Sequence, residues 1–147
     1  VNELLTVSLA AYTDGDVVGG IIDLRDLCGG RGGGVIRQVR LIDNAVQDEP
    51  FYLYLFDDKP AEIDDADPFI SNLTDAGAGE VGDAVRYLTR VSISSYVTLN
   101  GQSVAEVPDL NISHGTGALW GYLVANGGTP DYAAVNDLTL VVTGWMD

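Results

Sequence analysis

The sequence predicts an all-β fold, a jelly-roll-like antiparallel β-sandwich of about eight strands that forms a single domain over residues 1–147. Apolar, β-branched and aromatic residues occur in short runs that are separated by clusters of Gly, Asp, Asn and Pro. Such spacing is typical of sandwiches and barrels. Parallel βαβ units would need long helical segments between strands, and the sequence pattern contains none.

The turn residues between the apolar runs divide the chain into its expected strands. Gly15 supplies a positive φ angle to the turn at residues 13–16, and Asn100-Gly101 is a strong signal for a two-residue hairpin. Phe51–Phe56 has apolar or aromatic residues on both faces, which predicts a central strand. The expected strands are Leu4–Tyr12, Val17–Leu27, Val35–Ile42, Phe51–Phe56, Val85–Ser94, Tyr96–Leu99, Gln102–Val107, Leu119–Ala125 and Leu138–Trp145.

The charge of the chain is strongly unbalanced. It has 22 Asp and Glu residues against 7 Lys and Arg residues, a net charge of −15 at pH 7. Because binding to nucleic acids and to anionic lipids depends on basic residues, we expect neither DNA, RNA nor a membrane as a partner. Cys28 is the one cysteine of the sequence, so no intrachain disulfide can form, which is typical of a protein made in a cytoplasm.

The densest acid lies in Asp57–Gly82, which reads as a long acidic loop with one short helical turn near Pro68–Leu73. Asp64, Asp65 and Asp67 offer the oxygen ligands that calcium prefers, but the EF-hand spacing is missing. A solvated acidic loop is therefore the preferred interpretation, and we expect no cofactor and no metal.

Catalytic patterns are equally sparse. A Cys28–His114 dyad, or a serine triad through Asp109, is compatible with the sequence, but no G-x-S-x-G motif accompanies it. We therefore expect His114 to be an exposed loop residue, Cys28 to be buried or idle, and the protein not to be an enzyme. The glycine tract Gly29–Gly34 leads into a strand and not into a helix, which argues against a phosphate site.

Aromatic residues in the predicted strands allow two interpretations. They could form an exposed platform that stacks on sugar rings, or they could pack in the core or a subunit interface, which is the commoner use of strand aromatics. The residues concerned are Tyr52, Tyr54, Trp120, Tyr122 and Trp145.

Three parts of the chain resemble small virion proteins of tailed phages, of the capsid decoration or cement type. They are Tyr12–Gly20, Leu53–Pro60 and the end of the chain, where Leu119–Val124, Gly128–Tyr132 and Asp137–Leu140 follow the order seen in that group. The matching motifs are strand and turn patterns and include no catalytic residue. The glycine tract and the acidic middle depart from the group.

The resemblance implies a jelly-roll-like subunit on the capsid exterior of a virion, assembled in the host cytoplasm. Such a subunit would bind the major capsid protein, usually as a homotrimer or homodimer, and stabilise the shell. An alternative function is a carbohydrate- or receptor-binding sandwich of a virion tail or fibre. The contact candidates lie in the chain start and the glycine tract: Val1, Asn2, Glu3, Leu4, Leu5 and Arg31.

Overall fold

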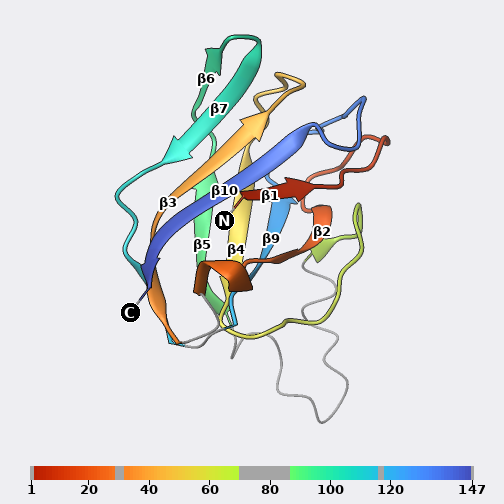
Figure 1. Cartoon of the computed structure of the whole chain (residues 1–147). Coiled ribbons are helices and arrows are strands. Elements are labelled where there is room, and N and C mark those ends of the chain that lie inside the picture. Colours follow the sequence, from red (N-terminus) through yellow and green to blue (C-terminus); the bar gives the residue numbers. More distant parts are fainter. Residues whose placement is uncertain (1, 29–31, 70–86, 116–117, 147) are drawn as a thin grey trace.

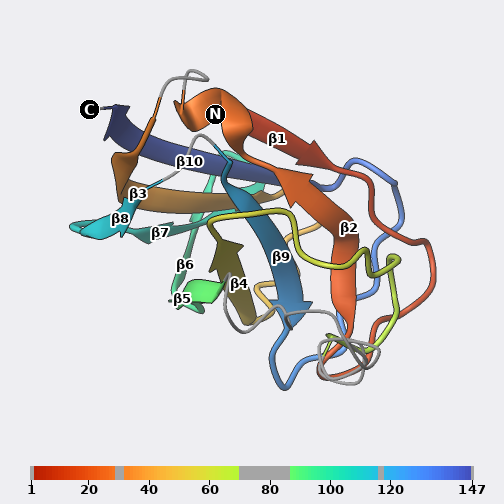
Figure 2. The same cartoon turned by 90° about the horizontal axis from the view of Figure 1, so that it is seen from below.

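A computed structural model describes residues 2–28, 32–69, 87–115 and 118–146 of the chain (Figure 1). The described residues form two antiparallel β-sheets, which Figure 2 shows as two stacked layers. The predicted β-sandwich is thereby confirmed. The larger sheet has the order β1 (Asn2–Leu5), β10 (Leu138–Met146), β3 (Gly34–Asp43), β7 (Gln102–Val107) and β6 (Tyr96–Leu99), and β8 (Ile112–His114) pairs with the start of β3.

The smaller sheet has four strands in the order β2 (Val17–Asp23), β9 (Trp120–Ala125), β4 (Phe51–Phe56) and β5 (Tyr87–Ile93). The chain changes sheet after each of its first three strands. Near its end, β9 belongs to the smaller sheet, and the last strand, β10, lies between β1 and β3 in the larger sheet. Strand β4 pairs with β9 on one side and β5 on the other, which confirms the predicted central position of Phe51–Phe56.

Two predicted strands are shorter than the sequence pattern indicated. Strand β1 ends at Leu5, and the following backbone bonds to other loops: the Tyr12 amide donates to the Pro130 carbonyl at 2.8 Å. Strand β2 ends at Asp23, whose carboxylate accepts from the Arg25 amide at 3.0 Å and introduces the 3-10 turn η1 (Arg25–Cys28). Apolar residues beyond these ends pack without ladder pairing, so the pattern alone overestimated strand length.

Strand β8 was not predicted, because three residues carry too little pattern. The two turn predictions are confirmed. Gly15 has φ +90°, and Asn100 and Gly101 have φ 52° and 84°, as a type I′ hairpin requires. None of the described helical residues forms a segment that is long and apolar enough to cross a bilayer.

The space between the sheets holds the main core. Alternate residues of each strand point inward, as the period of two requires. Its fully buried members include Leu41 and Val39 from β3, Leu53 from β4 and Leu140 from β10. These side chains come from strands far apart in sequence, so the core forms only when both sheets are assembled.

A second cluster lies on the outer side of the smaller sheet. Residues 57–69, which we call the covering segment, pass across β9 toward β2 (Figure 2). Ile63 and Phe69 of this segment are buried against β-strand aromatics such as Tyr122. The Tyr122 hydroxyl fixes the segment further, because it donates to the Ala61 carbonyl at 2.6 Å and accepts from the Ile63 amide at 3.1 Å.

The covering segment is also held by backbone hydrogen bonds to the start of β2. The Val17 amide donates to the Asp67 carbonyl at 2.9 Å, the Ala66 amide donates to the Val17 carbonyl at 2.8 Å, and the Phe69 amide donates to the Gly15 carbonyl at 2.9 Å. The described first half of the predicted acidic loop is therefore packed structure, because its apolar residues cover an apolar sheet face. The helical turn predicted near residues 68–73 falls mostly outside the described residues.

Two buried tyrosines in edge-to-face contact differ in their hydrogen bonding. The Tyr12 and Tyr132 ring centroids are 6.3 Å apart. The Tyr12 hydroxyl accepts from the Ser8 amide and donates to Asp65, both at 2.6 Å. The Tyr132 hydroxyl has no hydrogen-bond partner among the described residues. Burial raises the pKa of both phenols well above the usual value, because it disfavours the charged phenolate.

Substituting the two tyrosines by phenylalanine should have opposite effects on the free energy of unfolding. Tyr132→Phe removes a buried hydroxyl without a partner, and we expect an increase of up to about 1 kcal/mol. Tyr12→Phe removes two hydrogen bonds, and we expect a decrease of about 1–3 kcal/mol. Urea unfolding of both variants at pH 7 measures the difference. Equal losses in the two variants would contradict the assignment.

Candidate functional sites on the two outer faces

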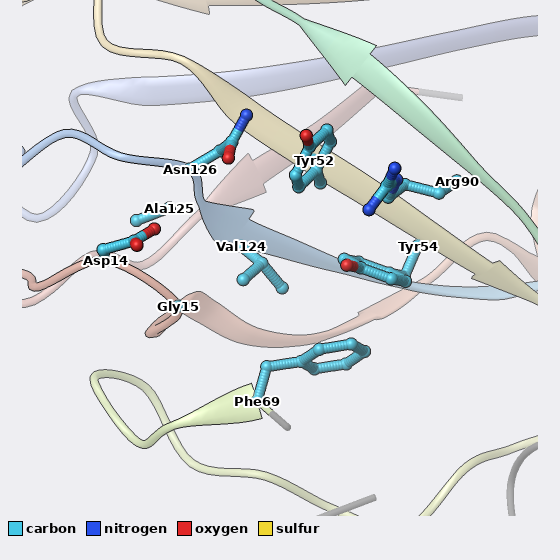
Figure 3. A pocket seen from close by; sticks show the side chains of 9 residues that line it. All are labelled: Asp14, Gly15, Tyr52, Tyr54, Phe69, Arg90, Val124, Ala125 and Asn126. Carbon is cyan, nitrogen blue, oxygen red and sulfur yellow. The ribbon is translucent and has the colours of Figure 1, made fainter. Parts of the chain in front are cut away.

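A pocket of about 280 Å³ opens on the outer side of the smaller sheet, beside the covering segment (Figure 3). Its base is apolar and buried, since Val124, Ala125 and Phe69 contribute to it. Its rim is polar. The complete lining is Asp14, Gly15, Tyr52, Tyr54, Phe69, Arg90, Val124, Ala125 and Asn126. This combination of an apolar base and a few polar groups is typical of small-molecule sites.

Arg90 is the cation of this pocket. It stands opposite Tyr54 in the β4–β5 register, and its guanidinium carbon lies 4.0 Å from the centroid of the Tyr52 ring. A hydrogen bond with Tyr54 raises the pKa of Arg90. The salt bridges found among the described residues involve other cations, namely Arg25, Arg40 and Lys59. Within the described part of the chain, Arg90 is thus positioned by Tyr52 and Tyr54 and not by a carboxylate.

The opposite side of the pocket is formed by two turns. Asp14 belongs to the turn before β2, and its Oδ1 accepts from the Gly127 amide at 2.7 Å. Asn126 follows β9, and its amide donates to the Pro50 carbonyl at 3.0 Å. Figure 3 shows Asp14 and Asn126 on the side of the pocket away from Arg90. The pocket therefore has a cation at one end and hydrogen-bonding groups at the other.

The outer side of the larger sheet carries a different feature, a row of outward-facing residues that crosses five strands. We call it the outer row, and cross-strand pairing connects its members in order. Its two ends are highly exposed, with Val97 at 61% and Leu4 at 60%. The row is Val97, Val104, Ile42, Thr139 and Leu4.

The neighbouring row on the same face is electrically balanced. Arg40 and Glu106 are paired across β3 and β7 and form a salt bridge of 3.1 Å. In a chain with a net charge of −15, the outer row contains no charged side chain, and its exposed ends Val97 and Leu4 are apolar. Exposed apolar surface of this kind marks contact surfaces for other macromolecules.

The candidate catalytic residues are not assembled into a site among the described residues. His114 was expected in an exposed loop, but it lies in β8 and is buried, because that strand pairs with β3 at Gly34. Asp109 is exposed in a turn with φ 56°. The backbone of Cys28 ends the 3-10 turn, and its side chain lies outside the described residues.

The three calcium candidates differ in their surroundings. Asp65 Oδ1 accepts from the Tyr12 hydroxyl and from the Gly19 amide, both at 2.6 Å, whereas Asp64 and Asp67 are exposed. Within the described ranges, no group of three or more His, Cys, Asp or Glu side chains could hold a metal ion. In the structure Asp65 accepts hydrogen bonds that join the covering segment to β2 and to Tyr12.

The predicted partner contacts are partly reassigned. Asn2 to Leu5 form the paired edge strand β1, and Leu5 is buried in the core. Leu4 remains an exposed contact candidate. The side chains of Asn2 and Glu3 lie outside the described residues, as do Val1 and Arg31.

The structure explains why the second half of the glycine tract consists of glycine. A side chain at Gly33 would collide with the His114 carbonyl, and one at Gly34 with the Trp145 carbonyl. These two glycines allow the chain at the start of β3 to approach its neighbours closely.

Some of the aromatic candidates are buried, and others are at least partly exposed. Trp120 and Tyr122 are buried in the outer cluster, as the core interpretation predicted. Tyr52 and Tyr54 are half-buried at the pocket, and Trp145 is 71% exposed on β10. Sequence reasoning missed Arg90, Phe69 and Asp14 as pocket residues. The pairing of Arg90 with Tyr54 across two strands has no local signal in the sequence.

Comparison with known proteins identifies no relative: no family model, no curated protein and no solved structure matches the chain.

The role of Asp65 can be tested by substitution. Asp65→Ala leaves the Tyr12 hydroxyl and the Gly19 amide without their acceptor, and we expect the free energy of unfolding to fall by about 2–4 kcal/mol. The exposed neighbour provides the control, because Asp64→Ala should change it by less than about 0.5 kcal/mol. Urea unfolding in the presence of chelator measures both. If the two variants lose the same stability, Asp65 has no special structural role.

Proposed function

We propose that this chain is a non-enzymatic structural protein of a phage virion, which binds the major capsid protein on the capsid exterior and stabilises the shell. The observation that carries the proposal is the outer row, an apolar stretch across the larger sheet beside a neutral salt bridge. We propose the outer row as the surface that contacts the capsid. A partner with an apolar, weakly charged surface would complement it.

The strand order supports the finer part of this proposal, a jelly-roll topology. The orders β1-β10-β3-β7 and β2-β9-β4-β5, with a chain that passes repeatedly between the sheets, agree with the two interlocked Greek keys of a jelly roll. The resemblance of the sequence to capsid decoration proteins points in the same direction. The acidic remainder of the surface would favour solubility and keep nucleic acid away.

The capsid proposal predicts that particles lacking the protein lose heat resistance and regain it when purified protein is added. Val97→Glu should abolish this rescue, because a desolvated carboxylate in the contact should weaken binding at least about tenfold. Leu9→Glu is the matched control, since Leu9 is equally exposed at 59% but lies outside the outer row. Heating followed by electron microscopy measures shell survival.

Three outcomes would contradict the proposal. Equal heat resistance of bare and complete particles would exclude a stabilising role. Full rescue by the Val97→Glu variant would exclude the outer row as the contact. Bare particles that are robust but fail to attach to cells would favour the alternative, a receptor-binding module.

Self-association as a homotrimer or homodimer remains a prediction, and exposed apolar surface supports it. On the outer side of the smaller sheet, Ile63 and Phe69 of the covering segment bury part of the apolar surface, which leaves less of it for an interface. Strand β10 still presents Trp145 at 71% exposure. We expect light scattering to give two or three times 15.6 kDa and Trp145→Ala to shift the mass toward the monomer. A monomer for both proteins at micromolar concentration would contradict this prediction.

A further inference from the structure

We propose that the pocket beside the covering segment binds one ring of an acidic saccharide, a pyranose that bears a carboxylate. The inference concerns a different face of the molecule from the proposed capsid contact, and it stands or falls independently of that function. It deepens the aromatic-stacking interpretation for Tyr52 and Tyr54, which the structure places together at the pocket.

The apolar part of the pocket suits the C–H face of a sugar ring. The Tyr54 and Phe69 rings lie 4.3 Å apart, centroid to centroid, and form one wall, while the buried Val124 side chain contributes to the base. Tyr52 stands beside Val124, since the two are paired between β4 and β9. Tyrosine offers an apolar ring and a polar hydroxyl together, which matches a ligand that has apolar faces and polar edges.

The cation of the pocket determines the charge of the ligand. Arg90 is stacked on Tyr52 at 4.0 Å, so its planar guanidinium is oriented before a ligand binds. A guanidinium that stacks on a ring keeps its N–H donors in its own plane, so they can bind a carboxylate through two parallel hydrogen bonds. Among the described residues Arg90 contacts tyrosines and forms no salt bridge, so the donors that Tyr54 does not use can bind an external carboxylate.

The far side of the pocket supplies partners for hydroxyl groups. The Asp14 carboxylate already accepts from the Gly127 amide at 2.7 Å, which fixes its orientation, and it has lone pairs left for further donors. The Asn126 side chain carries both a donor and an acceptor. A ligand with a carboxylate at one end and hydroxyls at the other satisfies Arg90 and these two residues together, which a purely apolar or a simple anionic ligand would not.

The size of the pocket limits the ligand to a single ring. Its volume of about 280 Å³ is at the lower end of the range for small-molecule sites, roughly 300–1,000 Å³. Because a single ring can make only a few contacts with the pocket, we expect a dissociation constant of about 1 mM.

The test uses the methyl glycosides of glucuronic acid and of glucose, titrated into the isotopically labelled protein at about 0.15 M salt and followed by NMR chemical shifts. We expect the uronide to shift the signals of Tyr54 and Val124 and to bind at least about tenfold more tightly than the neutral glycoside. Benzoate is the third ligand, and it separates saccharide recognition from recognition of any ring that bears a carboxylate.

The variant Arg90→Gln should lose this preference and bind both glycosides weakly. Arg37→Gln is the matched control, because Arg37 is also exposed but lies on β3 of the other sheet, where it donates to Asn111 at 3.5 Å. The comparison of the two glycosides needs only the unaltered protein, so it remains decisive if a variant fails to fold. No shift in the pocket with the uronide, equal binding of both glycosides, or tighter binding of benzoate would each overturn the inference.

Discussion

The smaller sheet is apolar on both faces, and the need to cover both of them shapes most of the molecule. Its inner face packs against the larger sheet, as in any sandwich. Its outer face carries aromatic side chains that would be exposed to water without a cover. Ile63 and Phe69 of the covering segment pack against them, including Tyr122. A segment rich in acid thereby becomes part of the fold, because its few apolar residues have a large surface to cover.

Several acidic side chains have structural duties in this arrangement. The buried Asp43 carboxylate accepts from the Ala45 and Gln47 amides, each at 2.8 Å, and so closes the turn after β3. Asp65 does the same between the covering segment and β2. A carboxylate that accepts from backbone amides satisfies donors that would otherwise be costly to bury. The strong negative charge of the chain is therefore partly a consequence of how its loops are closed.

The covering segment also creates the pocket. Phe69 lies at its described end and forms a wall against Tyr54, while Asp14 and Asn126 come from turns at the same end of the sheet. The outer row lies on the other sheet, and no segment of the described residues covers it as residues 57–69 cover the smaller sheet. One sandwich thus offers two faces of different chemistry, a polar-rimmed pocket on the smaller sheet and an uncharged row of side chains on the larger sheet.

The sequence by itself determined the fold class, the central position of Phe51–Phe56 and the hairpin at Asn100-Gly101, because these depend on period-two patterns and local turn preferences. It could not determine where β1 and β2 end, since strand ends depend on which distant groups accept the backbone hydrogen bonds. Nor could it show that Asp65 accepts hydrogen bonds from the Tyr12 hydroxyl and the Gly19 amide. The approach of Arg90 to Tyr52, and the burial of His114 against Gly34, arise from pairing between strands distant in sequence. Only the tertiary structure decides such contacts, because local sequence carries no record of which strands become neighbours.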